Sequence, residues 1–140
     1  MAETKEAAKK KILIIDDEED LCVLAKHTLT LERSDLEVVS ANDGPSGIRR
    51  AQADQPALII LDVMMPKMDG YEVCRLLKKD EKTRAIPVIM LTASGDPHLN
   101  QKAFEVGAVA CLTKPYRKAT LLNCVDMALA SVDRRRERSA

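Results

Sequence analysis

The chain has 140 residues, of which 46% are hydrophobic and 31% charged, a balance typical of one globular domain large enough to bury its own core. Its 22 basic and 22 acidic residues cancel, so no overall field attracts it to nucleic acid or to an anionic membrane. Aromatic residues make up only 2%, too few for a surface on which bases could stack, and no apolar run approaches the ~18 residues of a membrane helix.

The chain begins with ten residues, 1–10, that are expected to form a charged leader with little to bury. This leader lacks the apolar stretch of a secretory signal peptide. The cysteines form no C-x-x-C pair and lie at no metal-site spacing from a histidine, so we expect thiols in a reducing compartment. They are Cys22, Cys74, Cys111 and Cys124. Together these features predict a cytoplasmic protein.

Five short apolar runs follow the leader. They are residues 12–15, 36–39, 57–61, 88–91 and 108–112, and the second is the weakest. Because most of them are continuously apolar rather than alternating, they are typical of strands that are buried on both faces, as in a parallel sheet.

Segments with helical spacing separate these runs. In three of them apolar residues recur three and four positions apart, as on one face of a helix. The stripes are Leu21, Leu24, Ala25, Thr28 and Leu29; Val73, Leu76 and Leu77; and Leu122, Val125, Leu129 and Val132. Two further helix starts are indicated by an aspartate followed by a proline, at Asp43-Gly44-Pro45 and at Asp96-Pro97, and Gly107 is placed to end the second helix.

Strand and helix therefore alternate about five times, which predicts an α/β fold: a parallel sheet with helices on both faces. Right-handed crossovers make this a doubly wound arrangement. We expect one domain over residues 11–133, with residues 134–140 as a basic tail that follows the last helix. Cations are favoured near a helix C-terminus. We therefore interpret the arginines of the tail as favourable charges at the end of the last helix and not as a nucleic-acid-binding site.

Chemically active side chains follow four of the apolar runs. Asp16 and Asp17 come after the first run, Asp62 after the third, Thr92 after the fourth and Lys114 shortly after the fifth. In open α/β sheets the ligand site lies at the carboxyl ends of the strands. Each residue alone is typical of a turn or a helix cap, but together they predict a site at one edge of the sheet.

Three carboxylates that converge on one edge repel one another unless a cation joins them. Carboxylate oxygens suit a hard cation, and a few carboxylates beside phosphate oxygens favour Mg²⁺. A carboxylate beside Mg²⁺ and a lysine can also act as a nucleophile toward phosphorus. Asp62 is the best candidate because it stands alone in the central strand, whereas the Asp16-Asp17 pair is better suited to metal binding.

With these residues in this order, the sequence resembles the receiver domains of two-component response regulators, the CheY-like superfamily. The matching stretches are Ile14-Ile15-Asp16-Asp17-Glu18, the run from Leu61 and Asp62 to Asp69 and Gly70, Leu91-Thr92-Ala93, and Thr113-Lys114-Pro115-Tyr116. They occur in the family's order, and the resemblance covers nearly the whole chain, from about Lys11 to Val132. Jointly these motifs are far more specific than any one of them.

The resemblance implies a flavodoxin-like fold with five parallel strands in the order 2-1-3-4-5 and five helices. It also implies roles for individual residues. These are phosphoacceptor for Asp62, switch hydroxyl for Thr92, phosphoryl contact for Lys114, and Mg²⁺ ligation by Asp16, Asp17, Asp62 and the backbone carbonyl of Met64. The Lys114–Pro115 peptide bond is expected to be cis.

The partners that the resemblance implies are a sensor histidine kinase or a histidine phosphotransfer protein as donor, and a downstream protein as target. Phosphorylation is expected to alter the surface of the fourth helix, fifth strand and fifth helix, with dimerisation left open. No direct contact with nucleic acid or membrane is expected. The domain would catalyse only its own phosphorylation and dephosphorylation.

The sequence departs from the family pattern at Cys111. Receivers usually carry tyrosine, phenylalanine or histidine at that position, three residues before the site lysine. Tyr116 lies on the other side of Lys114 and does not replace the missing ring. We interpret Cys111 as a residue that fills the fifth strand, since nothing nearby predicts a lowered thiol pKa.

The resemblance implies a stand-alone receiver that signals by protein contact or passes its phosphoryl group along a relay, and three alternatives remain. The chain could be the receiver of a longer regulator whose output domain lies beyond residue 140. A phosphatase of the haloacid-dehalogenase type would use a similar set of groups, but it needs an aspartate two residues after the nucleophile, where Met64 stands. A flavodoxin-like electron carrier would need a phosphate-binding loop after the first strand and aromatic rings around a flavin. Asp16 and Asp17 would repel the phosphate.

Overall fold

The structure is a computed structural model that describes residues 9–93 and 96–139. Within these residues five strands and five helices alternate. The strands are β1 (Lys10–Ile15), β2 (Leu36–Ala41), β3 (Leu58–Asp62), β4 (Val88–Thr92) and β5 (Ala110–Thr113). The helices are α1 (Glu19–Glu32), α2 (Gly44–Asp54), α3 (Gly70–Lys79), α4 (Pro97–Glu105) and α5 (Lys118–Ser139). The alternation confirms the predicted α/β class.

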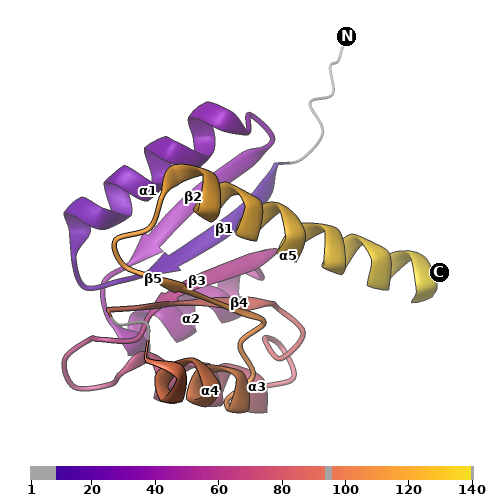
Figure 1. The fold of residues 1–140 in the computed structure, drawn as a ribbon. Helices are drawn as coiled ribbons and strands as arrows, with labels where there is room; N and C mark the ends of the chain where they lie inside the picture. Colours follow the sequence, from indigo (N-terminus) through magenta and orange to yellow (C-terminus); the bar gives the residue numbers. More distant parts are fainter. Residues whose placement is uncertain (1–8, 94–95, 140) are drawn as a thin grey trace, which may run out of the picture.

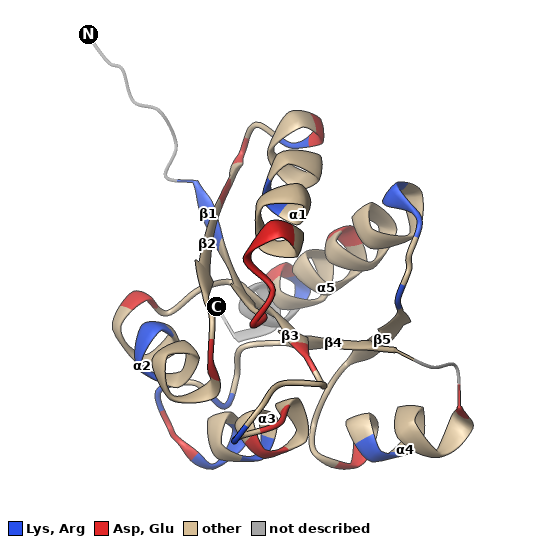
Figure 2. Ribbon diagram, turned by 90° about the vertical axis from the view of Figure 1, so that its left-hand side faces the viewer, with Lys and Arg blue, Asp and Glu red and all other residues tan. Residues whose placement is uncertain are grey.

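The strands form one parallel sheet in the order β2-β1-β3-β4-β5, as the family resemblance implied. Helices α1 and α5 cover one face of this sheet, and α2, α3 and α4 cover the other (Figures 1 and 2). Because parallel strands run in one direction, their carboxyl ends all reach the same edge, where connecting loops can bring distant residues together.

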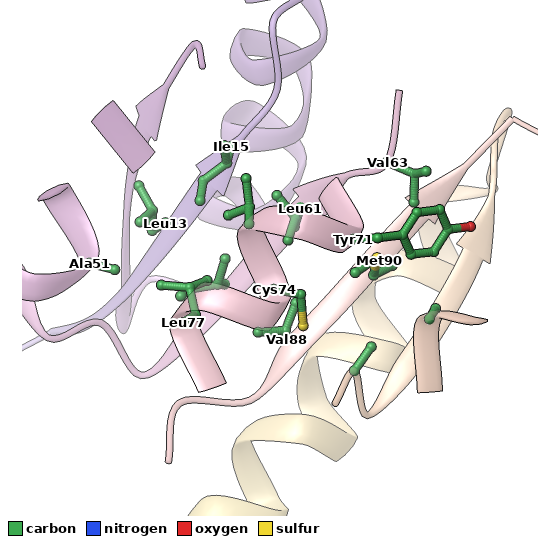
Figure 3. Close-up of a cluster of buried hydrophobic side chains, with 14 of the residues drawn as sticks. Leu13, Ile15, Ala51, Leu61, Val63, Tyr71, Cys74, Leu77, Val88 and Met90 are labelled. Carbon is green, nitrogen blue, oxygen red and sulfur yellow. The ribbon is translucent and has the colours of Figure 1, made fainter. Parts of the chain in front are cut away.

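Each face of the sheet has its own apolar core. The core under α2, α3 and α4 includes Leu13, Leu61 and Leu77 (Figure 3), and the core under α1 and α5 includes Ile14 and Ile60. Strands β3 and β4 are buried along their whole length, which explains their continuous apolarity. The edge strand β2 instead alternates between buried and exposed residues, so its sequence signal is weaker.

The helix starts follow the predicted capping chemistry. Asp43 accepts a hydrogen bond from the backbone N–H of Ser46 at 2.8 Å, and Asp96 accepts one from the backbone N–H of His98 at 2.9 Å. In both helices a proline follows within the first turn. Gly107 has a φ of 110° just after α4, a conformation that favours glycine and ends the helix as predicted.

The buried face of α1 differs from the predicted stripe. Ala25 and Leu29 are buried as expected, but Cys22 completes the buried face, and Leu24 is 63% exposed. Leu24 instead lines a cavity of about 490 Å³ on the α1 and α5 side of the sheet. The apolar residues of α1 cover two adjacent faces, so periodicity alone does not identify the face that packs on the sheet.

The chain ends also differ in part from the expectation. Helix α5 continues to Ser139, so residues 134–139, expected as a tail after the last helix, extend that helix. No glycine or proline occurs in 118–139 to end it. At the other end β1 begins at Lys10, and residues 1–8 of the expected leader lie outside the described residues. No helix in the described part of the chain is long and apolar enough to span a membrane.

Candidate phosphoryl and metal site

The five side chains predicted to form a site meet at the carboxyl edge of the sheet. Asp16 and Asp17 directly follow β1, Asp62 is the last residue of β3, Thr92 is the last residue of β4, and Lys114 directly follows β5. The backbone N–H of Lys114 donates to the carbonyl of Thr92 at 2.7 Å, which fixes the start of the lysine loop beside β4. Figure 2 shows the acidic connection from β1 to α1 at this edge.

The acidic residues lie close together but differ in exposure. Oxygen atoms from the carboxylates of Asp16, Asp17 and Asp62 all lie within 4.8 Å of one another. Asp16 and Asp62 are buried, whereas Asp17 is exposed. Asp16 is held in place because its Oδ1 accepts from the backbone N–H of Glu18 at 3.0 Å, and its carbonyl accepts from the Asn42 amide at 3.1 Å.

Lys114 lies between the two buried carboxylates. Its Nζ is 3.3 Å from Oδ2 of Asp16 and 3.3 Å from Oδ1 of Asp62. Burial opposes the charge of this ammonium, but the two carboxylates outweigh it and raise the pKa of Lys114. The lysine is therefore a fixed positive charge. The Lys114–Pro115 peptide bond is cis, which confirms the prediction.

Asp62 combines burial with a neighbouring negative charge. Burial, followed by repulsion from Asp16, raises the pKa of the Asp62 carboxyl from 3.8 to about 6, against the attraction of Lys114. Its Oδ1 also accepts a weak hydrogen bond from the backbone N–H of Met64 at 3.3 Å. One lysine thus leaves the excess negative charge of the site incompletely balanced.

The donor set fits a hard divalent cation. Three carboxylates supply oxygen ligands only, at mutual distances that one ion can bridge, and their charge exceeds that of Lys114. Asp17 keeps the ligand set open to solvent, as suits an ion that retains several waters. The backbone carbonyl of Met64, which follows Asp62 by two residues, stays a predicted ligand.

A glycine allows the loop after β3 to approach Asp62 closely. The first residue of α3 is Gly70, and a Cβ atom there would collide with the carbonyl oxygen of Asp62. The backbone N–H of Gly70 donates to the carbonyl of Val63 at 2.9 Å, and Asp69 caps α3 by accepting from the backbone N–H of Glu72. The loop is therefore packed tightly behind the central carboxylate.

Thr92 lies in the wall of a second cavity beside the site. This cavity of about 710 Å³ lies between the loop after β3 and the first turns of α4, and its lining includes Met64, Tyr71, Thr92 and Leu99. The Thr92 hydroxyl is 3.5 Å from the Leu112 carbonyl, at the limit of a hydrogen bond. The site is thus flanked by space on the side toward α4.

Cys111 behaves as a residue that fills the strand. It is half-buried in β5 and packs against the core under α2, α3 and α4. Burial, with a smaller contribution from Cys124, raises the pKa of its thiol. A raised pKa disfavours the reactive thiolate, in agreement with the interpretation from the sequence.

Sequence reasoning missed two residues that the structure brings to this region. The Asn42 amide supports the backbone of Asp16, and the Tyr71 hydroxyl contacts the first turn of α4. Both come from elements distant in the sequence from their partners, so no local motif indicates the contact. Tyr71 directly follows the Asp69-Gly70 pair, which is the only local signal near it.

Comparisons with known proteins agree with the geometry. A family model described as the response regulator receiver domain matches residues 12–126. The alkaline phosphatase synthesis transcriptional regulatory protein PhoP of Bacillus subtilis is 41% identical over 107 residues, which cover 76% of this chain and 43% of PhoP. The response regulator PleD of Caulobacter vibrioides is 46% identical over 105 residues, which cover 75% of this chain and 23% of PleD.

Solved structures give the same result for the fold. The chemotaxis protein CheY4 of Vibrio cholerae superposes with a TM-score of 0.81 at 33% sequence identity, covering 87% of this chain and 100% of CheY4. The chain therefore spans nearly all of a solved CheY-like structure. It spans less than half the length of PhoP and about a quarter of PleD.

Proposed function

The chain belongs to the response regulator receiver family, a family of signalling domains, and we propose that it receives its phosphoryl group on Asp62. One observation carries the proposal: the buried carboxylate of Asp62 ends the central strand with the Lys114 ammonium 3.3 Å away. Two further carboxylates, Asp16 and Asp17, lie within 4.8 Å of it. Such a set suits nucleophilic attack on a charged phosphoryl group.

The proposed step is a phosphoryl transfer from a phosphohistidine. A carboxylate oxygen of Asp62 forms a bond to phosphorus while the phosphorus–nitrogen bond of the donor breaks, and the bonding electron pair returns to the imidazole, which takes up a proton. Lys114 would contact the phosphoryl oxygens, and the Thr92 hydroxyl would donate to one of them. The protein itself is the acceptor, so we propose that it has no separate substrate.

We propose that Asp16, Asp17, Asp62 and the carbonyl of Met64 hold Mg²⁺. The bound ion would supply the positive charge that lets phosphoryl oxygens approach three carboxylates. Lys114 contacts both buried acids, but its single charge does not balance two carboxylates, as the raised pKa of Asp62 indicates. The residues of the chain would orient the reacting carboxylate and keep it buried.

A sensor kinase or a histidine phosphotransfer protein is the proposed donor, in a cytoplasmic setting. The exposed apolar side chains of Val23 and Leu24 on α1 offer a partner protein area to bury beside the site. The proposed output surface is formed by α4, β5 and α5. Exposed apolar residues occur on α4 (Phe104), on α5 (Met127) and directly before β5 (Val109), which supports a protein target.

The alternatives are less well supported. A haloacid-dehalogenase-type phosphatase requires an acid at position 64, where an exposed methionine stands. An output domain beyond residue 140 would add to the receiver role rather than replace it, and the curated relatives are longer than this chain.

The test is phosphorylation by acetyl phosphate with Mg²⁺, followed by intact-protein mass spectrometry. We expect one phosphoryl group on the wild type and none on Asp62→Asn, which keeps the shape of the side chain. Asp69→Asn is the matched control, because it is also a loop aspartate near the site and asparagine still caps α3. Full labelling of Asp62→Asn would refute the proposal.

A further inference from the structure

Helix α4 is tied to helix α3 by one aromatic side chain. Tyr71, the second residue of α3, is buried, and its hydroxyl donates to the carbonyl of Leu99 in the first turn of α4 at 3.2 Å. Lys102, one turn further along α4, lies over the Tyr71 ring with its Nζ 4.5 Å from the centroid. The ring therefore contacts α4 at two successive turns.

The same residue is adjacent to the proposed phosphorylation site. Tyr71 follows Gly70, which packs directly on the backbone of Asp62, and it shares the wall of the 710 Å³ cavity with Thr92. A movement of the loop after β3 or of the end of β4 can therefore reach α4 through the contacts of the Tyr71 side chain.

Tyr71 also lies near the position where the usual aromatic ring is missing. Tyr71 and Met90 belong to the same buried cluster (Figure 3), Cys111 packs against that cluster, and Met90 pairs with Cys111 across β4 and β5. Burial raises the pKa of the Tyr71 hydroxyl, and the neighbouring Cys111 contributes to the rise. The hydroxyl is thus a hydrogen-bond donor at neutral pH, on the side of the core that faces β5.

The hydrogen bonding of α4 is incomplete in this arrangement. The Oδ1 atom of Asn100, the residue after Leu99, is buried and has no hydrogen-bond partner within the described residues. An unsatisfied buried acceptor is destabilising, so a second position of α4 in which this atom finds a donor would gain a hydrogen bond there. The contact from Tyr71 then acts as a restraint on the observed position.

We infer that Tyr71 is the positioning residue that couples the phosphoryl site to α4, from α3 rather than from β5. The inference rests on the proposed function. In the unphosphorylated protein the Tyr71–Leu99 hydrogen bond holds the first turn of α4. When Thr92 moves toward a phosphoryl group, α4 shifts and this bond breaks, so its strength sets how readily the site switches.

The hydroxyl can be removed without removing the ring by Tyr71→Phe. Because coupling is reciprocal, weakening the restraint on α4 must also favour binding at the site. We expect beryllofluoride with Mg²⁺, a phosphoryl mimic, to bind Tyr71→Phe roughly 2- to 10-fold more tightly than the wild type, as the net strength of one hydrogen bond implies. In the free protein the amides of α4 should exchange hydrogen several-fold faster.

The matched control is Tyr116→Phe. It removes the same hydroxyl from the other tyrosine, which lines the cavity near α1 and α5 and has no hydrogen bond recorded within the described part of the chain. NMR titration gives the affinities, and hydrogen exchange reports on α4. The control should match the wild type in both measurements, and a merely structural role of Tyr71 would not tighten binding.

The outcomes separate the two proposals. Unchanged beryllofluoride affinity and unchanged α4 exchange in Tyr71→Phe, with normal binding by the wild type, would refute the coupling alone. Failure of the wild type to bind beryllofluoride would refute the proposed function and the coupling with it.

Discussion

At the scale of single residues, Asp62 shows how burial and a neighbouring acid together oppose the ionisation of a carboxylate. It is buried beside Asp16, and Lys114 balances only part of the charge. The pKa of about 6 means that ionisation of Asp62 is unfavourable in the folded, metal-free protein relative to the unfolded chain. The ionised form, which the proposed phosphorylation needs, therefore reduces the stability of the metal-free protein.

Asp62→Asn should accordingly stabilise the metal-free protein. Between the unfolded pKa of 3.8 and the folded pKa of about 6, the folded state binds more protons, so the stability contributed by this group falls as pH rises through that window. At pH ~7.5 in EDTA we expect the variant to be about 1–2 kcal/mol more stable than the wild type in urea unfolding, after allowance for solvent screening. The difference should vanish near pH ~4, and a variant less stable at both pH values would contradict it.

Removing a proposed metal ligand should change the Mg²⁺ requirement. Asp17→Asn leaves the buried Asp16–Lys114 contact in place but takes away one carboxylate, so we expect the Mg²⁺ concentration for half-maximal phosphorylation to rise about tenfold or more. Asp69→Asn should leave it unchanged. Equal phosphorylation of the wild type with Mg²⁺ and with EDTA would rule out the metal site.

Some residues of the site can be predicted from the sequence, and others cannot. Asp16, Asp62 and Thr92 follow from their position at the ends of apolar strands, because strand topology alone brings those ends together. Tyr71 does not, since its partner on α4 is 28 residues away and depends on how two helices pack. Contacts set by strand order are readable from a sequence, and contacts between packed side chains are not.

The glycine at the start of α3 makes a prediction at the scale of elements. Gly70→Ala would place a Cβ atom against the carbonyl oxygen of Asp62, which is rigid backbone at the end of β3. We expect a loss of about 1–3 kcal/mol in the free energy of unfolding, as for other overpacked core sites, together with slower phosphorylation. Urea unfolding and acetyl phosphate labelling measure the two effects. Wild-type values in both would show that the close packing is unimportant.

The elements themselves were predicted with different success. Strands β1, β3 and β4 were located within one or two residues because both of their faces are buried and their apolar runs are continuous. The buried face of α1 was predicted only in part. Apolar residues such as Leu24 lie on a second, exposed face of the helix and cannot be told from the buried ones by spacing alone. The end of α5 was placed too early because composition, not a helix-breaking residue, suggested the boundary.

At the scale of the whole molecule, the proposed switch connects one edge of the sheet with the surface of α4, β5 and α5. We expect beryllofluoride to change hydrogen exchange mainly in residues 94–107, and Cys111→Ala to keep most of that change, because Cys111 only fills β5. Residues 94 and 95, at the start of the segment expected to move, lie outside the described residues. Loss of the response in Cys111→Ala would assign the cysteine a special role.

We propose that the phosphoryl group is held by Asp62 and not by the neighbouring acids. Phosphorylation with acetyl phosphate and Mg²⁺, reduction of the acyl phosphate with borohydride, and peptide mass spectrometry identify the modified residue directly. We expect one modified position, Asp62, in the peptide that carries the end of β3. Modification at Asp16 or Asp17, with Asp62 unmodified, would contradict it.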